Sequence, residues 1–572
     1  MYNSRITVSD CALKMGKSTS GGGDSSSLLM PGVKSDDRSR ERKPRRIRCP
    51  AIDKTPDELE ASFIQLYAAY SEAAAHNKEE GEFADCEKKL IEVIRCFRNL
   101  KIVDSNVRQL FPQVLDLKKA VPLMINLLKY DKCGKRLASC ILITFEELTH
   151  VAFQVPSQEI QVGKLVESLF EMEALEVFAS TLGKFSEDDD LRAVQTIAQM
   201  IFQGRAAVAK TAGSSRKLII WVSAAIRGTK WDAKVCDVDF LMTLLMSYTE
   251  NGLLLGRDTL PAVVDALSSL IMSPEEEKTE KQKRKEEEED LPWTLFGCLF
   301  FLLEYPDNKV HFVNAGGIEA MIKLLQDGQK LGDYIYGSAI VALDIVKDCL
   351  AASDKFENDD LGLGIAIFPA SMDMILPSTM HFKEEIEERL ISLIESLTGG
   401  KTENYTLLAM FGENDCERIT WLMELFTRYS KKVGAVANHL KSKQLDSFEL
   451  YKKKCGDGFS TLQSIAVILG YLWLPEIKAK IESELSRHRI EKKLVLDVLS
   501  EYRDNIGNAG GTKTVIEKCI ARLEENYDQS MELDAQENSG QGMELDVPEK
   551  PDQELEMEME ASSKRQRVHN RR

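Results

Sequence analysis

One stretch of this chain constrains its fold more than any other, because three helical patterns follow one another within residues 308–350, NKVHFVNAGGIEAMIKLLQDGQKLGDYIYGSAIVALDIVKDCL. A short helix is expected to end at Gly316 and Gly317. Two longer apolar stripes follow, with the i, i+3, i+4, i+7 spacing of helices that bury one face: Ile318, Met321, Ile322 and Leu325, then Ala339, Ala342, Leu343, Val346 and Leu350. Two helices cannot bury such faces alone, so neighbouring units must stack.

The same pattern recurs along the chain. A stripe at 121–128 is followed by a turn containing Gly134 and by a second stripe at 137–148. Further stripes occupy 191–201, 260–267, 422–429 and 462–469. No strand alternation or βαβ rhythm interrupts them. One short and two longer helices in roughly 40 residues is the period of armadillo repeats. The sequence therefore predicts an all-α, armadillo-type α-solenoid with helical caps at both ends and disordered tails.

The composition divides the chain into five parts. The first and last parts are rich in Ser, Gly and charged residues, a composition that favours disorder. The predicted division is a basic, disordered tail at 1–50, an N-terminal helical cap at 51–117, armadillo repeats at 118–400 with a charged insertion at 273–290, C-terminal helical repeats or a cap at 401–527, and a disordered acidic tail at 528–572 that ends in a basic cluster.

Each tail carries a basic cluster of the kind that import receptors read. The clusters are RSRERKPRRIR at 38–48 and KRQRVHNRR at 564–572. They predict a nuclear location and binding to import receptors. The candidate nuclear-localisation residues are Arg42, Lys43, Arg45, Arg46, Arg48, Lys564, Arg565 and Arg567.

The net charge of −18 limits the class of partner. An acidic molecule repels a phosphate backbone, so we expect no direct nucleic-acid partner. It suits a partner with a Lys/Arg-rich segment, although acidity that only serves solubility is an equal alternative. The apolar run at 296–306 is about half a membrane span, which favours a buried helix and no membrane association. Twelve Cys without a C-x-x-C pair indicate a reducing compartment, without disulfides or a zinc site.

The sequence contains none of the short motifs that mark common enzymes, such as H-E-x-x-H, G-x-S-x-G, a Walker loop or G-x-G-x-x-G. Its seven His are scattered, and no pair of them has metal-ligand spacing. We therefore expect no catalytic residues, no metal and no cofactor.

Repeat solenoids bind partners through an extended concave surface, which the third helix of each armadillo unit lines. Here the expected third helices include 137–149 and 337–350. Their polar residues outside the apolar stripe are candidates to face a groove, where carboxylates can pair with Arg or Lys of an extended peptide. A plain solvated face is the alternative for each of them. The candidates are Glu146, Glu147, Asp344 and Asp348.

Four stretches resemble one known family. KKAVPLMINLLKYDKCGKRLASCILITFEELT at 118–149 and NKVHFVNAGGIEAMIKLL at 308–325 resemble two of its armadillo units. ENDCERITWLMELFTRY at 413–429 resembles its C-terminal E-N-D-x-E-x-x-x-x-L-M-E-L stretch, and VLDVLSEYRDNIGN at 495–508 with RLEENY at 522–527 resembles the end of its globular part. The chain thus resembles a divergent member of the beta-catenin-like protein 1 family over residues 85–527.

The resemblance implies a non-enzymatic nuclear scaffold that is associated with the spliceosome through the NineTeen-type complex. It also implies binding to the cell-division-cycle-5-like splicing factor through that factor's basic, nuclear-localisation-type segments. No catalytic or binding residues follow from it. The tails depart from the family pattern, in which the basic and acidic runs both lie near the N-terminus, whereas here the acidic run lies near the C-terminus.

Three alternatives remain beside the scaffold, and self-association stays open. The first is a nuclear import adaptor of the importin-alpha type, which would carry a W-x-x-x-N array. None of the Trp residues here has Asn at the fourth following position; they are Trp221, Trp231, Trp293, Trp421 and Trp473. The second is an enzyme without a recognisable motif. The third is a cytoplasmic armadillo protein of adhesion or signalling, which the two basic tail clusters disfavour.

Overall fold

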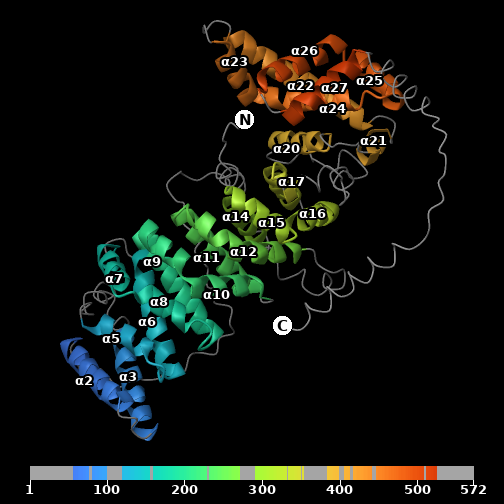
Figure 1. Cartoon of the computed structure of the whole chain (residues 1–572). Coiled ribbons are helices and arrows are strands. Elements are labelled where there is room, and N and C mark those ends of the chain that lie inside the picture. The colour runs from blue at the N-terminus through green and yellow to red at the C-terminus, as the bar shows by residue number, and fades with distance from the viewer. Residues whose placement is uncertain are drawn as a thin grey trace, which may run out of the picture.

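The structure, a computed structural model, is built from stacked helices (Figure 1). The residues that it describes are 56–75, 80–99, 119–154, 159–228, 231–270, 290–331, 333–349, 351–352, 383–398, 405–412, 417–440, 446–507 and 510–524. Within these ranges every regular element is a helix. The predicted tails at 1–50 and 528–572, with all the candidate nuclear-localisation residues, lie outside them.

One series of helices runs through almost the whole stack, each member in contact with the next. We call it the long series. Its members are α3 (Glu80–Asn99), α6 (Lys135–Gln154), α9 (Glu187–Ser214), α11 (Trp231–Ser247), α14 (Asp290–Leu303), α17 (Asp333–Val346), α20 (Lys383–Ser396) and α24 (Ser460–Tyr471).

A second series, the short series, lies alongside the first, and its members also contact one another in order. They are α2 (Pro56–Ala75), α5 (Ala120–Lys129), α8 (Ala174–Thr181), α10 (Arg216–Ile226), α12 (Asn251–Ser268) and α16 (Gly317–Leu331). Two further helices fill the space beside these series: α7 (Glu159–Glu171) and α15 (Pro306–Asn314).

The C-terminal helices form a separate group that packs on α20 and α24. This group contains a kink, η6, in which Asp457 and Gly458 leave helical geometry; Gly458 has a φ of 96° and lets the chain turn where Tyr429 comes close. Its members are α21 (Tyr405–Gly412), α22 (Glu417–Leu440), α23 (Ser447–Lys454), η6 (Cys455–Phe459), α25 (Pro475–Arg487), α26 (Lys492–Asn505) and α27 (Gly510–Leu523).

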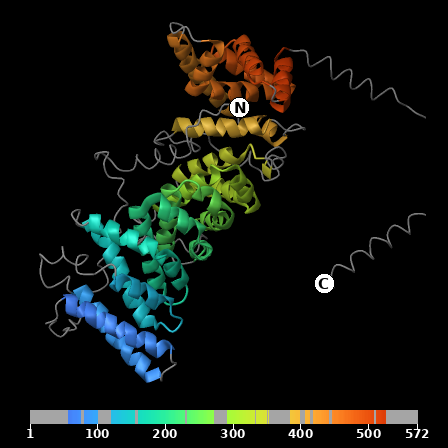
Figure 2. The ribbon, with the colours of Figure 1, turned by 60° about the vertical axis from the view of Figure 1, so that its left-hand side comes forward.

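The stack is bent. Figure 1 shows it running from α2 to α17 and then turning toward α20 and the C-terminal helices, with the long series toward the inside of the bend. Figure 2 shows the same succession from another side. The two predicted third helices are α6 and α17, and both belong to the long series. α17 ends at Val346, earlier than expected, and α14 begins at Asp290, the last residue of the predicted charged insertion.

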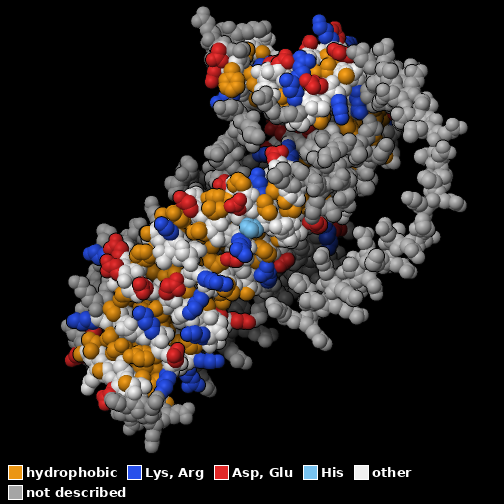
Figure 3. All heavy atoms as spheres, in the orientation of Figure 1, with side chains coloured by type: hydrophobic (Ala, Val, Ile, Leu, Met, Phe, Trp, Pro, Cys, Tyr) orange, Lys and Arg blue, Asp and Glu red, His pale blue; other side chains and the backbone are white. Residues whose placement is uncertain are grey.

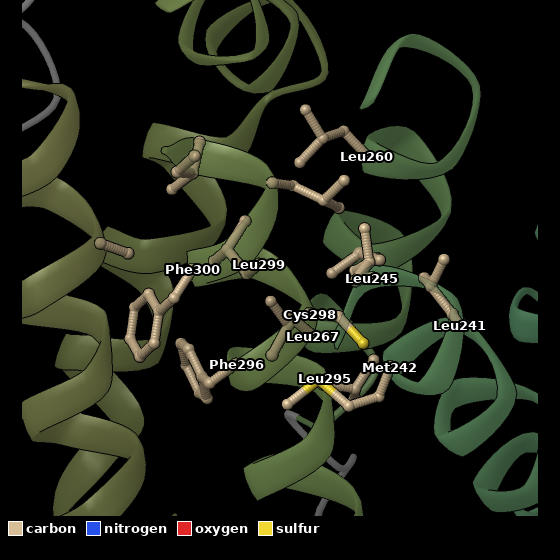
Figure 4. Close-up of a cluster of buried hydrophobic side chains, with 14 of the residues drawn as sticks. Leu241, Met242, Leu245, Leu260, Leu267, Leu295, Phe296, Cys298, Leu299 and Phe300 are labelled. Carbon is tan, nitrogen blue, oxygen red and sulfur yellow. The ribbon is translucent and has the colours of Figure 1, made fainter. Parts of the chain in front are cut away.

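The core is continuous because each helix of the long series buries apolar side chains against its neighbours. α14, with the sequence DLPWTLFGCLFFLL, is apolar on all sides and packs against α11, α12, α15 and α17. This confirms that the run at 296–306 contributes to a buried helix. Figure 4 shows its centre, where buried side chains of three helices meet: Leu241, Met242 and Leu245 of α11, Leu260 and Leu267 of α12, and Leu295, Phe296, Cys298, Leu299 and Phe300 of α14.

The predicted C-terminal stripes are also confirmed. All members of the stripes in α22 and α24 are buried: Leu422, Leu425, Phe426 and Tyr429, then Leu462, Ile465, Ala466 and Leu469. In α9 the stripe is buried at Val194, Ile197 and Ile201, while Leu191 and Ala198 are half-buried. Among the described residues no helix is both long enough and apolar enough to span a membrane.

A buried asparagine joins neighbouring repeats at two successive places. The side-chain amide of Asn251 donates to the carbonyls of Ala209 (3.0 Å) and Leu244 (2.9 Å). One repeat later, the amide of Asn308 donates in the same way to Gly252 (2.7 Å) and Leu302 (2.8 Å).

A glycine makes room for each of these asparagines. A Cβ on Gly213 would lie 2.1 Å from Asn251 Oδ1, and one on Gly256 would lie 1.9 Å from Asn308 Oδ1. The Asn–Gly pairs therefore fix the spacing of the repeats in the middle of the stack.

Candidate functional site

The long series carries carboxylates that bridge from one helix to the next, and two of the candidate groove residues, Glu146 and Asp344, belong to this pattern. Near the N-terminal end, Glu146 of α6 lies 3.5 Å (Oε2 to Nε) from Arg192 of α9. The side chains of both residues are about one-third exposed, at 33% and 28%. In the middle, the hydroxyl of Thr294 on α14 donates to Asp239 Oδ1 on α11 at 3.2 Å.

The densest set of charges lies where α17 meets α20. Asp344 is buried, with 6% of its surface exposed. Its Oδ2 accepts a hydrogen bond from Arg389 Nη1 of α20 at 2.7 Å, and its Oδ1 lies 2.9 Å from Lys347 Nζ. Lys347 in turn donates to the backbone carbonyl and the hydroxyl of Ser392 on α20.

The electrostatics of this junction favour the ionised pair. Burial alone would raise the pKa of the Asp344 carboxyl, but Lys347 and Arg389 together outweigh burial and hold that pKa below its ordinary value. Burial likewise opposes the charge of Lys347, while attraction to Asp344 and Glu395 raises the pKa of its ammonium group. Both groups therefore stay charged at neutral pH inside the protein.

The charged set continues into the C-terminal helices. Glu395 of α20 accepts a hydrogen bond from the hydroxyl of Ser464 on α24 at 2.6 Å, and burial raises the pKa of Glu395. On the other side of α20, Glu387 pairs with Arg428 of α22, and Glu384 lies 2.5 Å from Lys432 Nζ.

The structure places the four candidate groove residues in two separate pairs. Glu146 and Glu147 are half-buried on α6, and Asp344 and Asp348 lie at the end of α17, with α9, α11 and α14 between the two pairs in the long series. Asp344 lies inside the protein, where Lys347 and Arg389 engage it. Asp348, in the turn after α17, is the exposed member of the set.

The acidic side chains of α20 were not predicted from the sequence as part of the site. Residues 383–390, KEEIEERL, begin a helix of the long series with a run of acids, and Glu384, Glu387 and Glu388 all contact α22. The signal was present as an acidic run ahead of an apolar stripe, but it lies between the stripes that we assigned to repeats.

Metal and thiol chemistry add nothing to this picture. Within the described ranges no cluster of three or more His, Cys, Asp or Glu side chains has the geometry of a metal site. The eight cysteines whose side chains the structure describes are unpaired, and burial raises the pKa of the Cys133 and Cys519 thiols to about 12, which keeps both thiols protonated and unreactive.

Several known proteins are similar to this chain. The human beta-catenin-like protein 1 is 23% identical over 422 residues, which cover 68% of this chain and 71% of the human protein. The mouse protein of the same name is 22% identical over 443 residues, covering 71% and 75% of the two chains. A solved structure from work on a phosphorylation switch in the interaction between cadherin and beta-catenin aligns over 82% of each chain, with 12% identity and a TM-score of 0.40.

The family described as "Catenin-beta-like, Arm-motif containing nuclear" matches residues 71–500, from within α2 to within α26. The match covers most of the described helices, including both groups of candidate residues. The identities of 22–23% to curated relatives make this chain a divergent member. The chain belongs to the family of catenin-beta-like, arm-motif-containing nuclear proteins.

Proposed function

We propose that this chain is a non-enzymatic nuclear scaffold that binds basic, extended segments of splicing proteins along its long series, within the NineTeen-type spliceosome-associated complex. The cell-division-cycle-5-like factor is the first partner to test, and import receptors that read the basic tail clusters are the second class. Membership of a nuclear arm-motif family supports the scaffold role and the nuclear location.

The observation that carries the choice of ligand is the use of carboxylates along the long series. Glu146 and Asp344 already bind the side chains of Arg192 and Arg389 across helix boundaries. A carboxylate takes a guanidinium well because two oxygens face two N–H donors. The exposed Asp348, next to the Asp344 site, offers the same chemistry to an arginine or lysine from outside the chain. The net charge of −18 favours approach of such a segment.

The first test is an affinity purification of the tagged chain from nuclear extract, treated with nuclease and analysed by mass spectrometry. Recovery of NineTeen-type components supports the proposal. Recovery of importin-beta with diverse cargo, and without splicing proteins, would assign the chain to the import adaptors instead.

The second test measures binding of a basic peptide from the cell-division-cycle-5-like factor to the purified chain. The double variant Glu147→Lys, Asp348→Lys should weaken binding about tenfold, because two favourable charge contacts of roughly 0.5–1 kcal/mol become repulsive. The matched control is Glu482→Lys, at an exposed acid of α25. Affinity should also fall as salt rises, because exposed charge pairs are screened. Equal effects of the two variants would show that the ligand does not use the long series.

A further inference from the structure

The short series carries a surface whose charge is opposite to that of the chain as a whole. From Leu191 to Trp231 the sequence contains no Asp or Glu, although the protein is acidic overall. Seven basic residues lie in this stretch: Arg192, Arg205, Lys210, Arg216, Lys217, Arg227 and Lys230. Figure 3 shows Lys and Arg side chains interleaved with hydrophobic ones over α10 and α12.

Two contacts align α10 with α12 and define the surface. Ser223 donates to the carbonyl of Asp258 at 3.2 Å, and Arg227 Nε lies 2.8 Å from Asp265 Oδ2. The two helices therefore run in the same direction, and Ile220 lies level with Leu254.

Apolar side chains stand exposed on this surface beside unpaired cations. Ile220 is 57% exposed, Leu253 48% and Leu254 50%. One helical turn away lie the exposed Arg216 and Lys217 of α10 and Arg257 of α12, and no ion pair engages these three cations within the described chain. Two exposed acids border these residues: Glu250, one turn before Leu253 and Leu254, and Asp258. The α10–α12 patch is defined as Arg216, Lys217, Ile220, Leu253, Leu254 and Arg257.

The start of α10 is electrostatically unsatisfied. Arg216 and Lys217 occupy its first turn, where the positive end of the helix dipole repels cations. The N-cap residue Ser215 makes no capping hydrogen bond, and its buried Oγ lacks a partner among the described residues. By contrast, the preceding helix α9 is capped by Ser186 and has four acids in its first turn. An anionic ligand at the N-terminus of α10 would supply the negative charge that the first-turn acids provide at α9.

The chain itself contains a segment of matching chemistry. Residues 528–560 hold twelve Asp and Glu and one Lys, and the acids alternate with apolar residues in MELD at 531–534, MELDV at 543–547 and ELEMEME at 554–560. Such a segment can place carboxylates on Arg216, Lys217 and the N-terminus of α10 while Met and Leu cover Ile220 and Leu254. A polynucleotide fits less well, because it offers no aliphatic groups for these side chains, and the patch has no exposed aromatic ring for base stacking.

The distance is within reach of the tail. A path from α27 to α12 passes through contacting helices in the order α27, α24, α20, α17, α14 and α12. With about 8–10 Å between the axes of packed helices, these five steps span about 40–50 Å. The described chain ends at Glu524, and the nineteen residues from there to Met543 extend to roughly 65 Å.

We propose that the acidic–apolar tail of this chain, residues 531–560, docks on its own α10–α12 patch. The tail is therefore a ligand of the short series, on the side of the stack away from the carboxylates of the long series.

The direct test is carbodiimide cross-linking of the full chain, which joins Lys amines to carboxylates in contact, followed by mass spectrometry. Cross-links should join Lys217 to Asp or Glu between 532 and 560 and should disappear in 0.5 M salt. Lys135, exposed in the first turn of α6, is the internal control and should give none with the tail. A tail cross-linked only to its own basic end, or only between copies in a mixture of isotopically labelled and unlabelled chains, would overturn the proposal.

A second measurement uses a fluorescent peptide of residues 528–560 and its anisotropy. The variant Arg216→Glu, Lys217→Glu should weaken binding to the full chain at least tenfold, whereas Lys135→Glu, Arg136→Glu should not. Both pairs are exposed and open a helix, where Glu is favourable, so both variants should fold.

The full chain should also bind this peptide about tenfold more weakly than a full chain whose tail acids are changed to Asn and Gln. The reason is that a tethered tail competes at an effective concentration near millimolar. Absence of peptide binding together with Arg216/Lys217-dependent binding of single-stranded RNA would assign the patch to phosphates and refute the tail as its ligand.

Discussion

The middle of the stack and the junction of α17 with α20 join their repeats by different chemistry. In the middle, the neutral amides of Asn251 and Asn308 donate to backbone carbonyls of two helices each. At the junction, the ionised Asp344 holds Lys347 and Arg389. A neutral amide that is hydrogen-bonded costs little to bury, and losing it removes two hydrogen bonds. A buried ion is tolerated only while its partners are complete, because an isolated charge pays the full desolvation cost.

The largest effect is expected from Asp344→Ala. The substitution removes the buried carboxylate that engages both Lys347 and Arg389, and breaking a buried pair costs about 3–5 kcal/mol. The rate of amide hydrogen exchange in α17 and α20 should rise by the factor that corresponds to this loss of stability. The rates in α5 to α9 should change less. The exposed Asp348→Ala is the control and should stay within about 0.5 kcal/mol. If both variants behaved alike, the junction would not depend on its buried charges.

Asn308→Ala should have a smaller and more local effect. It removes the two hydrogen bonds to the carbonyls of Gly252 and Leu302, which together contribute about 1–3 kcal/mol. Exchange should speed up in α12 and α15 and stay unchanged in the C-terminal helices. Asn314→Ala, at the exposed end of α15, is the matched control. A loss of protection that spread evenly over the chain would mean that the Asn–Gly pairs do not act repeat by repeat.

The helical stripes could be predicted from the sequence because periodicity reports burial directly. Ile465 and Phe426 lie on stripes and are buried, and the order of the third helices follows from the repeat. The roles of Asp344 and Asp348 could not be separated. Both lie beside the same stripe, four residues apart, and what distinguishes them is α20. Arg389 belongs to a helix and lies 45 residues after Asp344 in the chain. The spacing of residues within α17 does not show which side of α17 this later helix covers.

The Asn–Gly pairs were missed for a similar reason. Asn251 and Gly213 belong to different helices, and their significance lies in an approach that only the stacked arrangement creates. The available signal was the recurrence of a Gly followed by an Asn in two successive repeats, at 213 and 251 and again at 256 and 308. The two Gly-to-Asn spacings are 38 and 52 residues, and they differ because the charged insertion lies within the second.

The middle of the stack contains a buried carboxyl group, that of Asp237, which behaves unlike the ionised groups at the junction. Burial raises the pKa of Asp237 on α11 to about 7, and repulsion from Asp190 adds to this. The folded state then holds a proton that the unfolded chain releases near pH 3.8, so stability is full below that value and falls as pH rises toward 7. Asp237→Asn should abolish this loss, giving a higher denaturation midpoint than the native chain at pH 8 and a similar one at pH 4. Equal midpoints at pH 8 would mean that Asp237 is ionised at no cost.

The smallest effect is expected at the surface pair of Arg227 and Asp265, which joins α10 to α12. Their side chains are 43% and 59% exposed, so water competes for both charges. A double-mutant cycle with Arg227→Ala and Asp265→Ala should give a coupling of about 0.2–1 kcal/mol that vanishes in 1 M salt. The equivalent cycle on Asp344 and Arg389 should give a larger value that salt changes less, because the Asp344 side chain is only 5% exposed and a buried charge is screened less. Similar couplings and similar salt dependence would remove the distinction between a junction built on charge and a middle built on neutral contacts.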